Sequence, residues 1–103
     1  MYAHTSIRDV FRKLKKSNEG YLLAFGVGDV YEFRYCDAGA IVAALPDVRF
    51  DGEVDFKRVT VHKLGIFPLA ARLAAKGLKI AMVERRVADN RVTYRIASRS
   101  DSK

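Results

Sequence analysis

The sequence predicts one α+β domain, in which a mixed central β-sheet is flanked by about three helices. Its 103 residues can bury one hydrophobic core but are too few for a second. Half of the residues are hydrophobic and only two are proline, a composition typical of a folded globule. Apolar periodicity along the chain gives the order α, β, β, α, β, α, β, β. We expect residues 1–97 to form the domain and residues 98–103 a polar tail.

The first helix is predicted over residues 5–16. Ser6 is placed to cap it, and Asp9 follows three residues later in a capping-box position. An apolar stripe is expected to face the core, made of Ile7, Val10, Phe11 and Leu14. Three lysines gather near the C-terminal end, where the helix dipole tolerates positive charge: Lys13, Lys15 and Lys16.

A hairpin is predicted next. Residues 21–28 are apolar on both faces, which is typical of a central strand. Gly28 and Asp29 supply the turn. Residues 30–35 alternate, so one face should carry Tyr31, Phe33 and Tyr35 toward the core and the other Val30, Glu32 and Arg34.

The remaining elements follow from turn residues and apolar runs. We predict a short helix over 36–45 opened by Asp37 as its cap, and a short edge strand with an Asp51–Gly52 turn within 46–56. A strand over 57–62 precedes a helix over 65–77, with Pro68 in its first turn and Gly77 as its stop. The last two strands, 78–84 and 91–97, are joined by a turn at 88–90.

The net charge of +7 is unevenly distributed. Residues 1–20 hold five basic and two acidic side chains, residues 21–56 two and seven, residues 57–79 six and none, and residues 84–103 six and three. A basic surface formed by the first helix and the C-terminal half would attract polyanions, foremost nucleic acid. The alternative is a basic protein whose charge serves solubility alone.

Enzymatic chemistry has little support. The single cysteine, Cys36, is distant in sequence from His4 and His62, which is a weak signal for a nucleophile. There is no metal-ligand spacing, no phosphate-binding loop and no indication of a cofactor. One cysteine, no apolar run of membrane length and no secretory signal lead us to expect a cytoplasmic protein without a membrane partner.

Three ordered motifs resemble the N-terminal, mismatch-recognition domain of the MutS mismatch-repair proteins. "GYLLAFGVGDVYEFRYCDAGAIVAAL" is similar to the family pattern "llFrmGDFYElf.dDA". "LAARLAAKGLKIAMVERR" resembles "yl.kLv..G.kVAicEQ", and "NRVTYRIA" occupies the place of the closing strand. The resemblance covers roughly residues 8–97 and implies a MutS domain I-like fold that binds DNA. The chain holds no ATPase motif, so we expect a stand-alone, ATP-independent module.

The resemblance also implies roles for individual residues. In the family a Phe-x-Glu motif stacks its phenylalanine on a mispaired base from the minor groove, while its glutamate hydrogen-bonds to that base. By position the motif falls on Val30 and Glu32, so the glutamate is present and the aromatic ring is replaced. Because valine has no π face, mismatch-specific reading is expected to be weakened. Tyr31 cannot substitute, since alternation sends it to the opposite face.

Two functions from different classes remain. The first is a nucleic-acid-binding module that uses Val30, Glu32, Arg34, Lys13, Lys15, Lys16, Lys63, Arg85, Arg86, Arg91 and Arg95. Its DNA could be mismatched, bent or single-stranded. The second is an interaction or regulatory module that kept the fold and binds a protein or itself. Without the resemblance, Glu32 is a solvated surface residue, and the aromatic residues Tyr21, Phe25, Phe33 and Tyr35 are core residues.

Overall fold

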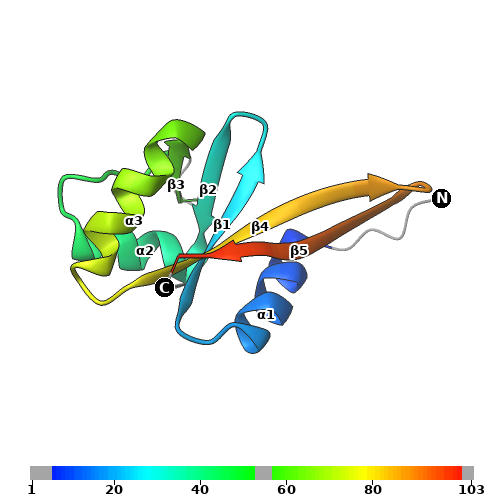
Figure 1. Ribbon diagram of the computed structural model, residues 1–103, viewed down its shortest axis with the longest axis horizontal. Helices are drawn as coiled ribbons and strands as arrows, with labels where there is room; N and C mark the ends of the chain where they lie inside the picture. Colours follow the sequence, from blue (N-terminus) through cyan, green and yellow to red (C-terminus); the bar gives the residue numbers. More distant parts are fainter. Residues whose placement is uncertain (1–5, 53–56, 101–103) are drawn as a thin grey trace.

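The computed structural model describes residues 6–52 and 57–100, and a five-stranded mixed sheet with helices on both sides organises them (Figure 1). The sheet order is β3-β2-β1-β4-β5. The strands are β1 (Tyr21–Val27), β2 (Val30–Arg34), β3 (Arg58–His62), β4 (Lys79–Ala88) and β5 (Arg91–Arg99). The helices are α1 (Ile7–Ser17), α2 (Tyr35–Ala44), the short 3-10 turn η2 (Lys63–Gly65) and α3 (Ile66–Ala74). The predicted α+β class and element order are confirmed.

Strand β1 lies at the centre of the sheet, as its two apolar faces predicted. It pairs antiparallel with β2 through the Gly28–Asp29 turn and parallel with β4. Leu22 and Ala24 enter one core cluster, and Leu23 and Phe25 enter the other. A strand buried on both faces therefore separates two hydrophobic cores.

The two sheet faces are covered differently. Helices α2 and α3 cover one face, here called the two-helix face, around Phe33, Ile41, Leu73 and Ile80. Helix α1 alone covers the other, called the α1 face, where Phe11 stacks on Phe25 at 6.4 Å between ring centroids. Figure 1 shows α1 on the opposite side of the sheet from α2 and α3. Because one helix is narrower than five strands, part of the α1 face stays open.

Helix α1 begins and packs as predicted. The Ser6 hydroxyl accepts the Asp9 backbone N–H at 3.1 Å, which satisfies one of the free donors at the helix start. The predicted apolar stripe packs in the core of the α1 face: Ile7, Val10, Phe11 and Leu14. Asn18 ends the helix and is buried, with its side-chain carbonyl accepting from Arg99.

The alternation predicted for residues 30–35 holds through Arg34 and fails at Tyr35. Phe33 is buried in the core of the two-helix face and Tyr31 packs against that core, as expected. Tyr35 instead starts α2 with φ of 56° and packs against Phe11 on the α1 face. A left-handed residue reverses the direction of the chain, so the two-residue period cannot extend across it.

The prediction that Asp37 caps α2 is wrong. Arg34 occupies the cap position and makes no capping side-chain hydrogen bond. Asp37 points into the core, where one carboxylate oxygen accepts the Leu23 N–H at 2.9 Å and the other accepts the Lys15 ammonium at 2.9 Å. This buried carboxylate joins α1, α2 and β1.

Strands β4 and β5 are longer than predicted. Strand β4 continues beyond Glu84 to Ala88, and β5 continues beyond Ala97 to Arg99. Ser98 pairs with Met82, and the Ser100 hydroxyl accepts the Ile80 N–H, so the first residues of the predicted tail are bound to the sheet. Cross-strand hydrogen bonds alone extend this hairpin, because its outer residues reach no core.

Other predicted features are confirmed or only partly described. Helix α3 has Pro68 near its start, and Gly77 follows it with φ of 79°. Within 46–52 there is no strand, only a single bridge from Asp51 to Arg58. The rest of the edge strand predicted within 46–56 falls on 53–56, outside the described residues.

Candidate nucleic-acid interface

The open part of the α1 face is formed by β2 and β3. Val30, Glu32 and Arg34 lie there on β2. Their cross-strand partners on β3 are His62, Thr60 and Arg58. Thr60 and His62 are exposed, and the other four residues are half-buried. The strand predicted to carry the family motif thus has one side available to a ligand.

Glu32 lies between two arginines rather than in bulk solvent. Its side chain is only 12% exposed. One carboxylate oxygen accepts a hydrogen bond from Arg34, and the other lies 3.8 Å from Arg58 Nε. Arg58 Nε also lies 2.9 Å from an Asp51 carboxylate oxygen, without the alignment of a hydrogen bond. Glu32 is therefore ion-paired and only slightly solvated, unlike the solvated surface residue expected without the resemblance.

Val30 is half-buried beside the β1–β2 turn. Its neighbour across the hairpin is Val27, which is exposed, and its neighbour on β3 is His62. Val30 thus forms a small apolar area at the tip of the open surface. The area has the position expected of a wedge but lacks a ring on which a base could stack.

Helix α1 carries exposed basic side chains on the α1 face. The Arg8 guanidinium carbon lies 5.2 Å from the centroid of the Tyr35 ring, and Tyr35 directly follows Arg34 in the chain. Arg12 and Lys16 follow at four-residue spacing, which places them on the same side of the helix. Lys13 lines a groove between α1 and Tyr94 of β5.

Lys15 differs from the other lysines of α1. Its ammonium donates to Asp37 and, at 2.6 Å, to the Tyr21 carbonyl. Both partners belong to the protein interior, so this cation already has a structural role.

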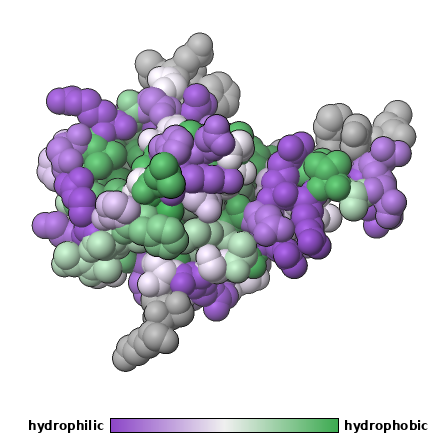
Figure 2. All heavy atoms as spheres, turned by 45° about the horizontal axis from the view of Figure 1, so that its top comes forward, coloured by the Kyte–Doolittle hydropathy of each residue, from purple (hydrophilic) through white to green (hydrophobic). Residues whose placement is uncertain are grey.

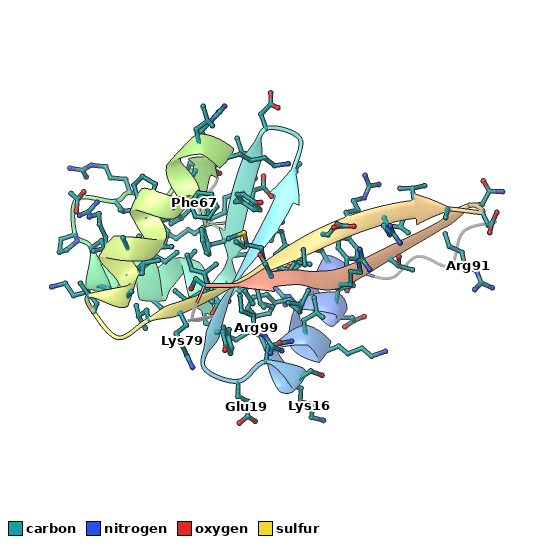
Figure 3. All side chains as sticks on the ribbon, viewed as in Figure 1. Lys16, Glu19, Phe67, Lys79, Arg91 and Arg99 are labelled. Carbon is teal, nitrogen blue, oxygen red and sulfur yellow. The ribbon has the colours of Figure 1, made fainter. Side chains whose placement is uncertain are left out.

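The β4–β5 hairpin forms an arm beyond Glu84. Figure 1 shows it reaching past the rest of the molecule, and in Figure 2 it stands apart with a mostly hydrophilic surface. Arg85, Arg86, Arg91 and Arg95 lie on it and are exposed. Arg86 and Arg95 each lie 3.4 Å from Glu84. Within the described residues no ion pair involves Arg85 or Arg91, and Figure 3 shows Arg91 at the far end.

The structure brings only some of the predicted site residues together on the α1 face. Arg85 shares the α1 face with Val30 and Glu32, because Arg85 pairs with Tyr94, whose ring contacts Phe25. On the arm, Arg86, Arg91 and Arg95 alternate with the Arg85–Tyr94 pair, so they lie on the opposite side of the hairpin. Lys63 lies in η2, with its ammonium over the Tyr31 ring at 5.7 Å. Tyr31 packs on the two-helix face, so Lys63 lies toward the other side of the sheet.

Sequence reasoning missed two exposed arginines of α1 and three residues of the open surface: Arg8, Arg12, Arg58, Thr60 and His62. The sequence does indicate that the last three share one face, because alternation in "RVTVH" places them on the side opposite to Val59 and Val61. Their approach to Glu32 depends on the β2–β3 register, which one strand alone does not specify.

The aromatic residues serve the core, as the alternative interpretation held. Phe25 and Phe33 are buried, and Tyr21 and Tyr35 pack against the cluster on the α1 face. Within residues 6–52 and 57–100, no three His, Cys, Asp or Glu side chains are grouped to hold a metal ion. None of the described helices has the length and apolar character needed to cross a bilayer.

The family model of MutS domain I matches residues 5–100, nearly the whole chain. The chain belongs to the MutS domain I family. Domain I of MutS is a DNA-binding domain without catalytic activity of its own, and its family function is mismatch recognition. Among curated proteins no match was found.

The segment in which we expected the family's Phe-x-Glu motif lies within the matched residues. It forms β2, whose Val30 and Glu32 side chains lie on the open surface.

Proposed function

We propose that this protein is a DNA-binding module that holds the duplex mainly through its phosphates, along the open part of the α1 face. The observation that carries the proposal is the MutS domain I match over residues 5–100. The charge distribution supports it, because cations of α1, Arg34, Arg58 and Arg85 of the arm all lie on the α1 face.

Reading of a mismatch is weakened in this proposal for two reasons. Val30 offers an apolar contact but no stack, and a base stacked on an aromatic ring contributes about 1 to 3 kcal/mol. Glu32 already shares its carboxylate with Arg34 and Arg58, so bonding to a base edge would require a change of partners. Glu32 then acts as a positioning residue for the two arginines, whose Nε atoms make no hydrogen bond among the described residues.

Salt dependence of DNA binding tests the proposal. If about five cations contact phosphates, the logarithm of the association constant falls against the logarithm of salt with a slope of about −4 to −5. Arg85→Ala should reduce the magnitude of that slope by about one unit, and affinity should fall alike for matched and mismatched duplexes. Fluorescence anisotropy with a labelled duplex over a salt series measures both quantities.

Arg72→Ala is the matched control. Arg72 is an exposed arginine on α3, across the sheet, and it is paired with Asp47. Its removal should leave the slope unchanged. Binding that is indifferent to salt, or an equal effect of the two substitutions, would contradict the proposed surface.

A further inference from the structure

An apolar stripe runs along η2 and α3 on the two-helix side of the sheet. Leu64 is 84% exposed and Phe67 is 71% exposed, the largest values among the exposed large hydrophobic residues that the structure describes. Ala71, Ala74 and Ala75 are also exposed. Their spacing from Leu64 is three, seven, ten and eleven residues, so all five lie along one face of the helical segment.

The core does not need this face. Helix α3 buries Ile66, Leu69 and Leu73 against the sheet, and these three residues form its inner side. A helix whose inner side is packed ordinarily presents polar residues outward, whereas η2 and α3 together present a leucine, a phenylalanine and alanines. Contiguous exposed apolar surface of this kind marks an interaction site. Figure 3 labels Phe67 on α3.

The shape of the stripe suits another helix. The large side chains of Leu64 and Phe67 lie at its N-terminal end. At the C-terminal end the short alanine side chains leave a shallow depression along the helix. Small residues allow a second helix to approach closely, so that bulky side chains of a partner can pack over the alanines. Helix α3 is only nine residues long, which limits the contact to the small, transient class of interface.

The basic residues beside the stripe indicate the charge of its partner. From residue 63 to residue 76 the chain holds Lys63, Arg72 and Lys76 and no aspartate or glutamate. Arg72 is ion-paired with Asp47, so Lys63 and Lys76 supply the excess positive charge beside the stripe. A second copy of this chain would bring like charges together across the stripe, which disfavours self-association. An acidic partner would be attracted instead.

We propose that the stripe formed by Leu64, Phe67, Ala71, Ala74 and Ala75 docks an amphipathic helix of another protein, whose apolar face is flanked by glutamate or aspartate. The stripe and the open DNA surface lie on opposite sides of the sheet, so both can be occupied at once. A DNA-bound module would thereby recruit an acidic helical segment.

The test uses the full chain and two labelled helical peptides of about 16 residues, each with leucines at helical spacing on one face. The flanking positions are glutamate in one peptide and lysine in the other. The glutamate peptide should bind at least about tenfold more tightly, as measured by fluorescence anisotropy. Phe67→Ser and Leu64→Ser should each weaken that binding about tenfold or more, the scale of a central apolar anchor.

Val87→Ser is the matched control, because Val87 is an exposed apolar residue on the arm and lies outside the stripe. It should leave peptide binding unchanged, and Phe67→Ser should leave DNA affinity unchanged. Equal binding of the two peptides, or none at millimolar concentration, would overturn the proposal. So would concentration-dependent self-association of the chain that Leu64→Ser abolishes, since the occupant would then be a second copy.

Discussion

Replacing Asp37 with alanine removes a carboxylate that ties α1 and α2 to the central strand. The substitution leaves the Leu23 N–H without its acceptor in a fully buried position, which costs about 1 to 3 kcal/mol. It also removes the charged hydrogen bond from Lys15, which contributes about 1.5 to 3 kcal/mol. The Lys15 side chain is 27% exposed and can regain water, so the sum falls toward the lower end, about 3 kcal/mol.

A loss of this size is a large fraction of the roughly 5 to 15 kcal/mol that stabilises a domain. For a chain of this length it lowers the melting temperature by roughly 12 to 24 °C. Asp37→Asn keeps an oxygen acceptor for Leu23 and should cost about half as much. Urea unfolding followed by circular dichroism, analysed by linear extrapolation, gives the free energy of each variant.

The Lys15→Met and Asp37→Asn substitutions complete a double-mutant cycle. Because each single change leaves the other group poorly partnered, the double variant should be more stable than the sum of the single effects predicts. Asp47→Asn breaks a solvent-exposed pair with Arg72 and should move the midpoint far less than Asp37→Ala does. An Asp37→Ala midpoint equal to that of Asp47→Asn would refute the structural role assigned to this carboxylate.

Two further predictions concern base reading and pH. Val30→Phe should restore a stacking ring on the open surface and raise affinity for a mismatched duplex by about 1 to 3 kcal/mol, with little change for a matched duplex in the same titration. Adding Glu32→Gln tests whether the carboxylate contributes, and equal gain on both duplexes would contradict a stacking role. The hydrogen bonds from Arg72 hold the pKa of Asp47 below its ordinary value of 3.8, so this pair contributes stability above that pH and loses it as pH falls further. Thermal melts of the protein and of Asp47→Asn should therefore differ most at neutral pH and converge in acid, and a gap that widens in acid would contradict this sign.

Local pattern in the sequence determined the element order, the central position of β1 and the capped start of α1. Each of these depends on residues a few positions apart: a two-sided apolar run, the Ser6–Asp9 spacing and the stop at Gly77. Alternation also placed Val30 and Glu32 on one outward side of β2, because the side on which a residue of a strand lies is a local property.

Only the tertiary structure decided what surrounds these residues. From the sequence, Lys15 is one more cation of a basic helix. In the structure its ammonium is bound to the carboxylate of Asp37, 22 residues away. Glu32 reads as an exposed acid, yet the β2–β3 register places Arg58 beside it. Pairing between distant segments depends on strand register and on a left-handed residue at Tyr35. Neither follows from periodicity within one element, because that periodicity indicates only which side of its own element a residue occupies.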